Sequence, residues 1–470
     1  MRRWHLPALV VLFVASRAWM AHLGVRFDAS PLDYYWQYAD PRLLREDLLR
    51  TVFYLHSQPP LFNLWLGCIL KLFPVHYTTA FSWSFYGLGL LLTVTTFSTL
   101  ALLRVPRWFA FVVTAVFIMA PDVILYERWL FYEYPAMELV AVLAYLFCRF
   151  IADGRMWCAG GAATVAAVLS LTVSAFHPLW VALIVVALCL LRRHSQRRVL
   201  LWCVLPLVTV ASAGIKQRVV FGHWGMGTWH TTAAASLTTV LQVPLGWREE
   251  LAKQGKISQW SLHGSPYSDQ LSDFAGLVEI HEWGVPVLDE ITKSTGYVNR
   301  MHSVYLEMAD AFTRDSLYVA KYHPEIIEPF GAMVRPWLFT ASNDCPFVPH
   351  FEWLSAYVCW HERIVFGAKG GFLALGLILP LLAGLRTMWR GMRGRVDKAH
   401  AAAVGFLVAN VIGLNFPMIV LGCHEQQRYR FRTAALSVVL AALLMVQVGR
   451  VVARMWRAFG PDMEEKHESV

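Results

Sequence analysis

The chain has 470 residues, of which 57% are hydrophobic and only 16% are charged. Soluble domains carry about a quarter charged residues, so this composition argues against an ordinary soluble protein. The formal net charge is +9, but the basic residues stand at the ends of apolar blocks, which argues against nucleic-acid binding and is typical of membrane topology. The apolar blocks approach the roughly 20 residues that a spanning helix needs. We therefore predict an all-α polytopic membrane protein.

The first apolar block, residues 6–23, follows Arg2 and Arg3. A cleaved signal peptide shares such a basic start, but Arg17 interrupts the block and no small-residue cleavage site follows. We predict a retained first helix. Residues 61–73 are apolar but short, which indicates an interfacial or re-entrant helix. Further spans are predicted at residues 79–103, 108–120, 136–151, 158–174, 179–191, 199–213, 367–385, 401–421 and 434–451, about ten in all.

The loops between these spans alternate in charge. Those on the side of the N-terminus are basic, above all residues 192–198 and 386–398, and the other loops are acidic and aromatic. Because cytoplasmic loops are rich in Lys and Arg, both termini are predicted to be cytoplasmic. Residues 214–366 lack a span and are predicted to form a mainly helical extracytoplasmic domain, between membrane modules 1–213 and 367–470. Cys345 and Cys359 fall in this domain, and their pairing is left open.

Three outer loops concentrate reactive side chains. The first carries Asp28, Asp33 and Asp40, and then His56 and Gln58 before Pro59-Pro60; the second carries Asp122, Glu127 and Glu133; the third carries Glu425, Arg428 and Arg430. Taken singly, each carboxylate is more often a solvated cap, and His56 is more often a structural histidine. Arginines on the side that should be poor in them, however, indicate an anionic partner such as a lipid phosphate.

Several of these segments resemble the GT-C superfamily of glycosyltransferases, in particular the protein mannosyltransferase and aminoarabinose transferase type. The strongest match is HSQPPLFNLWLG followed by LKLF; PDVILYERWLFYEYP and EQQRYRF are weaker matches. The resemblance covers the first half of the chain better than the outer domain. It implies a GT-C-like fold in a bacterial inner membrane, with the active site facing outward.

The resemblance also implies roles for individual residues. Asp28, or alternatively Asp33, would be the general base of an inverting transfer from a polyprenyl-phosphate sugar to a protein, lipid or glycan acceptor. This chain has Phe27-Asp28-Ala29 where the family often has Glu or Tyr beside the acidic residue, so both candidates stay open. Glu133 would assist the base or position the acceptor. Arg428 and Arg430 would bind the donor phosphate, with His56, Gln58, Glu127 and Glu425 lining the cavity.

Other classes of protein remain in competition. A secondary transporter would need intramembrane charges, and Arg17 and Lys71 are the main ones in or near the apolar blocks. A lipid-linked glycan ligase or polymerase shares the arginine–phosphate chemistry, and a non-catalytic scaffold would use the acidic loops only as solvated caps. Some GT-C enzymes use a divalent cation beside paired acids, but this sequence has no Asp-x-Asp, and no metal ligand is assigned.

Overall fold

The computed structural model describes residues 4–228, 239–262, 282–327, 330–342, 352–366, 370–420 and 426–459. Within these ranges every regular element is a helix, and the two β-bridges are isolated. The predicted all-α class is confirmed for this part of the chain.

Seven of the described helices are long and apolar enough to cross a membrane. They are α1 (His5–His22), α6 (Tyr77–Leu102), α9 (Glu133–Asp153), α12 (Gln196–Phe221), α19 (Gly371–Met392), α20 (Lys398–Val420) and α22 (Ala434–Phe459). This is the architecture of a multi-pass membrane protein.

The other three predicted spans form shorter helices. α7 (Arg107–Ile118) is followed by α8 (Pro121–Glu127) after a bend of 57°, and the pair would make an eighth span. The bend coincides with Pro121, which has no amide hydrogen and begins α8. α10 (Met156–Thr172) and α11 (Pro178–Leu191) have 17 and 14 residues. The count of ten spans therefore stays a prediction.

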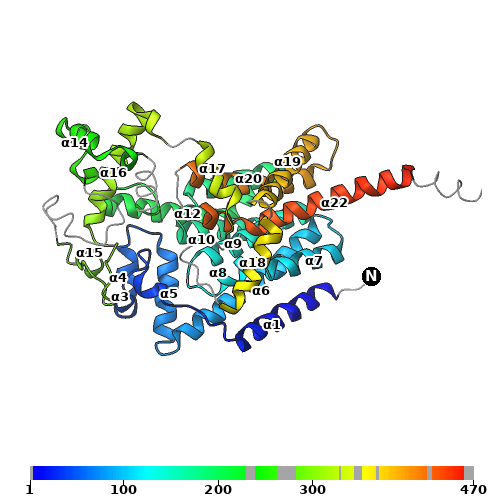
Figure 1. The fold of residues 1–470 in the computed structure, drawn as a ribbon, viewed down its shortest axis with the longest axis horizontal. Coiled ribbons are helices and arrows are strands. Elements are labelled where there is room, and N and C mark those ends of the chain that lie inside the picture. The colour runs from blue at the N-terminus through cyan, green and yellow to red at the C-terminus, as the bar shows by residue number, and fades with distance from the viewer. Residues whose placement is uncertain are drawn as a thin grey trace, which may run out of the picture.

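The start of α1 and the end of α22 lie at the same end of the molecule (Figure 1). Figure 1 shows the N-terminus and the end of α22 at one end of the long axis, which we call the terminal end. At the opposite end, the loop end, lie α3 (Pro41–Glu46), α4 (Leu48–Phe53), α14 (Leu245–Lys253), α15 (Pro286–Asp289) and α16 (Val304–Tyr322). The remaining described helices are α2 (Pro31–Tyr34), α5 (Pro60–Leu72), α17 (Phe330–Phe339), α18 (Glu352–Phe366), α21 (Gln426–Phe431), and the short 3-10 turns η1 (Arg193–Ser195), η2 (Val240–Gln242), η3 (Gln259–Leu262) and η5 (Pro324–Ile326).

The stretch predicted as an outer domain has a small core of its own. Met308 and Phe312 of α16 pack with Val240, Leu251 and Trp260, apart from the main core. α12 continues to Phe221, past the predicted boundary at residue 213. The division into three segments stays a prediction. Cys345 lies outside the described residues, and Cys359 is a free thiol on α18.

Candidate functional site at the loop end

The main chain joins the first and second loops at Asp28. The amide of Asp28 donates to the carbonyl of Arg128 at 2.7 Å, and the amide of Leu130 donates to the carbonyl of Asp28 at 2.9 Å. The carboxylate accepts a hydrogen bond from the amide of Ser30 at 2.9 Å. Asp28 is only half-buried. Its carboxylate is thus held by a fixed backbone and is still accessible to another molecule.

Aromatic side chains lie around this bridge. The charge of Asp28 adds to burial in raising the pKa of Tyr34. Tyr35 is buried, with its ring 4.5 Å from that of Phe131 and 5.9 Å from that of Trp129. The two loops therefore share an aromatic core directly beside the Asp28 backbone.

The late arginines meet this core through Tyr35. Arg428 Nη1 donates to the Tyr35 hydroxyl at 3.0 Å, and the guanidinium lies 5.3 Å from the centre of the Phe131 ring. Arg428 Nε is also 3.4 Å from the carboxylate of Glu133. Residues of the first, second and third outer loops thus lie in contact at one place.

Glu133 begins α9 and is fully buried. Arg432 binds its two oxygens, with Nε at 2.5 Å from Oε2 and Nη2 at 2.8 Å from Oε1. Sequence reasoning did not single out Arg432. Arg432 lies in the turn directly after α21, and both Arg428 and Arg432 face Glu133.

Arg430 points elsewhere. Its guanidinium donates to the carbonyl of Trp337, to the carbonyl of Thr340 at 2.5 Å and to Ser342 Oγ at 3.2 Å. These acceptors lie at the end of α17, where carbonyls lack helical partners. Burial lowers the pKa of Arg430 to about 10. Its donors are used to fix α17, so the geometry gives Arg430 a positioning role and not the expected contact with a phosphate.

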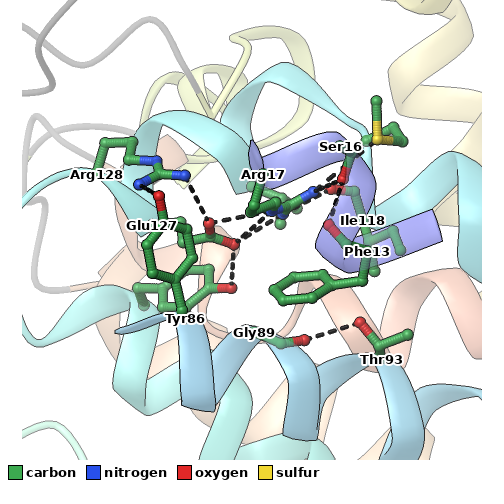
Figure 2. A network of polar contacts seen from close by, with 12 residues as sticks. Phe13, Ser16, Arg17, Tyr86, Gly89, Thr93, Ile118, Glu127 and Arg128 are labelled. Atoms are coloured by element: carbon green, nitrogen blue, oxygen red, sulfur yellow. Dashed lines mark hydrogen bonds and ion pairs between the residues drawn. The ribbon is translucent and has the colours of Figure 1, made fainter. Parts of the chain in front are cut away.

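Glu127 lies in a buried ion pair with Arg17 of α1 (Figure 2). Arg17 Nη2 is 2.7 Å from Oε2, and the Tyr134 hydroxyl donates to the same oxygen at 3.0 Å. Figure 2 shows Arg128 on the other side of this carboxylate, with its Nη2 at 3.5 Å from Oε1. The charge that interrupts the first apolar block is thus neutralised inside the protein, and Glu127 is not part of an open cavity.

Arg128 connects this ion pair to the Asp28 bridge. Its carbonyl accepts from Asp28, while its guanidinium donates to the Tyr86 hydroxyl and lies 4.2 Å from the centre of that ring. Its Nη2 is held by the carboxylate of Glu127 at 3.5 Å, whereas its buried Nε has no hydrogen-bond partner among the described residues. Buried donors of this kind are costly unless a ligand or water satisfies them. Sequence reasoning did not single out Arg128 either.

His56 and Gln58 are buried where the first loop meets the outer segment. His56 Nε2 lies 2.9 Å from the carbonyl of Met301, and Nδ1 lies 3.2 Å from Thr228 Oγ1. Burial lowers the pKa of His56 to about 4. The ring is therefore neutral at pH 7 and bonded on both sides, which is the structural role expected of a lone histidine.

Residues 290–301 of the outer segment bind the first loop along its length. Ser294 donates to Asp40 through both its amide and its hydroxyl, each at 2.6 Å, and Lys293 Nζ donates to the carbonyl of Tyr35 at 2.6 Å. Burial lowers the pKa of Lys293 to about 7.

Asp33 lies on the solvent side of this contact. Its carbonyl accepts from Thr295 Oγ1 at 2.8 Å, and its side chain is exposed. Partial burial raises its pKa, while Lys293 and Arg45 oppose that shift.

Asp122 and Glu425 are the last two predicted residues. The side chain of Asp122 accepts from the amide of Val123 at 2.9 Å at the start of α8. Glu425 lies outside the described residues. Among the residues that the structure describes, no three His, Cys, Asp or Glu side chains form a group able to hold a metal ion.

Comparisons of the chain with protein-family models, with curated proteins and with solved structures find no match.

Proposed function

We propose that the chain is a membrane glycosyltransferase that moves a sugar from a polyprenyl phosphate to an acceptor hydroxyl at the loop end, on the extracytoplasmic face. The observation that carries the proposal is the position of Asp28. A half-buried carboxylate is fixed by two main-chain hydrogen bonds to the second loop, beside a cluster that contains Arg128 and Arg428.

The reaction would be a single displacement. Asp28 accepts the proton of the acceptor hydroxyl as that oxygen attacks the anomeric carbon of the donor sugar. The bond between that carbon and the phosphate oxygen breaks, and its electron pair leaves with the polyprenyl phosphate. Negative charge develops on the phosphate, where arginine is the preferred binding group.

Arg128 and Arg428 are the candidates to bind that phosphate. Arg428 bonds to Tyr35, the aromatic residue of the first loop that packs against Phe131. Arg128 has one buried nitrogen, Nε, without a hydrogen-bond partner among the described residues, and its own carbonyl accepts the amide of Asp28. Glu133 positions Arg428 and Arg432 in this proposal, and Arg430 fixes the loop that carries them through α17.

The test is sugar transfer in membranes, with a panel of radiolabelled polyprenyl-phosphate sugars. Wild type, Asp28→Asn and Asp33→Asn would be compared at equal amounts of folded protein. Transfer that requires the lipid donor and is lost in Asp28→Asn alone supports the proposal. Transfer lost only in Asp33→Asn keeps the enzyme class and moves the base. Folded wild type that consumes no donor with any tested acceptor argues against a transferase.

A second function, proton-coupled transport, is favoured by one observation. Glu138 of α9 is fully buried, and neither of its carboxylate oxygens has a hydrogen-bond partner among the described residues. Buried carboxylates inside membrane helices are often proton carriers. Solute uptake into proteoliposomes that depends on a pH gradient and is lost in Glu138→Gln would support transport. Sugar transfer unaffected by Glu138→Gln would leave this residue outside the reaction.

A further inference from the structure

A cavity of about 550 Å³ shares no lining residue with the candidate site. It is lined by the end of α6, the last turns of α19, the start of α20 and the last turns of α22. α19 packs closely on α20: a Cβ at Gly384 would lie within van der Waals distance of Val404, and Gly391 lies against Ala401. The cavity is thus a feature of how these helices pack, and not a gap between loose ends.

The wall of the cavity is strongly basic. The guanidinium groups come from Arg104, Arg386, Arg390, Arg450 and Arg454, and Asp397 is the carboxylate among the lining residues. Asp397 lies 3.6 Å from Arg104, and both side chains are largely exposed. α19 contributes Arg386 and Arg390, and α22 contributes Arg450 and Arg454. The two arginines of each pair are four residues apart, so they lie on the same helix face.

Apolar side chains form another part of the lining, with Thr387, His400 and Gln447 as its uncharged polar or titratable members. Leu103 and Leu443 are buried, and Val446 and Val451 complete that side. Thr387, also buried, donates to the carbonyl of Ala383 within its own helix. A cationic wall next to an apolar wall fits a molecule with an anionic head and a hydrocarbon tail.

Basic residues at this end of a membrane protein are expected from topology alone. Arg393, Arg395 and Arg457 illustrate this, because they lie in the same helix ends and connection but do not line the cavity. The arginines of the cavity differ because they converge from three segments on one hollow. Basic pockets between membrane helices are suited to anionic lipid headgroups.

We propose that this cavity binds the phosphate group of an anionic phospholipid, with the arginines of α19 and α22 around the phosphate and the apolar wall against the first methylenes of an acyl chain. α19, α20 and α22 are spanning helices, so their ends lie at the depth of the lipid headgroups. The proposal is independent of the reaction at the loop end. A soluble phosphate compound would offer the arginines the same phosphate group as a phospholipid, but it has no acyl chain to contact the apolar wall.

The experiment measures binding to the purified full chain in a neutral detergent. The probes are phosphatidylglycerol, phosphatidylcholine and inorganic phosphate, and the readouts are bound lipid by native mass spectrometry and the dissociation constant from titration. The cavity variant is Arg386→Gln/Arg390→Gln/Arg454→Gln. The matched control is Arg393→Gln/Arg395→Gln/Arg457→Gln, which removes the same charge from the same end.

We expect phosphatidylglycerol to bind the wild type and the control variant alike, and the cavity variant at least about tenfold more weakly. Binding of inorganic phosphate with the same dependence on the cavity arginines would support the phosphate site and identify a soluble ligand. Equal weakening in both variants, or equal binding of phosphatidylcholine, would overturn the proposal. If the triple variant fails to fold, Arg390→Gln is compared with Arg393→Gln by the same criteria.

Discussion

Arg432 and Glu133 form a bidentate ion pair, and both side chains are almost fully buried. The two residues are 299 positions apart in the chain. The pair ties the loop before α22 to the start of α9, and Arg428 lies on the same carboxylate. The free-energy cost of desolvating two buried charges is offset only when the charges are close and their hydrogen bonds are satisfied. The pair therefore holds the third outer loop, which carries Arg428 and Arg430, next to the second outer loop.

Breaking this pair should be costly. Glu133→Gln leaves Arg432 buried without its charge partner, and we expect a loss of about 3–5 kcal/mol in the free energy of unfolding. The double variant Glu133→Gln/Arg432→Gln should lose less than the sum of the two single variants. Unfolding in detergent by heat or denaturant measures both. The control is Glu290→Gln, which breaks the half-exposed pair with Arg42 and should cost less than about 1 kcal/mol. Equal losses for the two pairs would contradict this account.

The proposed base gives a separate prediction. Asp28→Asn keeps an oxygen that can accept from Ser30 and leaves the main-chain bridge intact, so stability should stay within about 0.5 kcal/mol. Sugar transfer should fall by about 10²–10⁴-fold, as for loss of a general base. Asp33→Asn changes an exposed side chain and should leave transfer nearly unchanged, because the contact with Thr295 uses the carbonyl. A stable Asp28→Asn protein with full activity would remove Asp28 from the mechanism.

Much of the architecture could be predicted from apolar block length and charge alternation, because membrane helices must satisfy their own backbone. The predicted block at residues 79–103 became α6 (Tyr77–Leu102) almost unchanged. The block at residues 179–191 also coincides with one helix, α11 (Pro178–Leu191), but 14 residues are fewer than a spanning helix needs, so hydropathy located the helix and not how it crosses the membrane.

The partner of each charge could not be inferred in this way. Nothing local in the sequence distinguishes Arg430, which binds the end of α17, from Arg428, which binds Tyr35. The sequence predicted Glu127 as a cavity residue and did not show that Arg17 is its ion-pair partner in the fold. Such pairings join residues far apart in the sequence, 90 positions for Arg430 and Thr340 and 110 for Arg17 and Glu127, and local sequence patterns do not encode them.

The buried His56 predicts a loss of stability in acid. Its pKa in the folded protein is about 4, below its ordinary value of 6.5, because burial disfavours the charged ring. The unfolded chain therefore binds more protons between these values, and stability falls as the pH drops from about 6.5 to 4. The loss specific to this residue should approach about 3 kcal/mol at the lower limit. The stability difference between wild type and His56→Gln, measured across this range, should change in favour of the variant at low pH. A difference that is constant with pH would contradict the assignment of a neutral, buried ring.

Gly89 and Gly87 of α6 offer a test of the buried ion pair by packing alone. A Cβ at Gly89 would lie 2.7 Å from the Tyr134 hydroxyl, 2.8 Å from Phe13 and 2.9 Å from Glu127 Oε2, whereas a Cβ at Gly87 would meet no atom within 4 Å. Gly89→Ala must therefore displace the carboxylate that pairs with Arg17, at a cost of about 1–3 kcal/mol in stability. Gly87→Ala adds the same methyl group to the same helix and should be neutral or slightly stabilising. Thermal unfolding of the two variants in one detergent compares them directly. If both behave alike, the close approach of α1, α6 and α8 around Glu127 is not the feature that makes a glycine necessary at position 89.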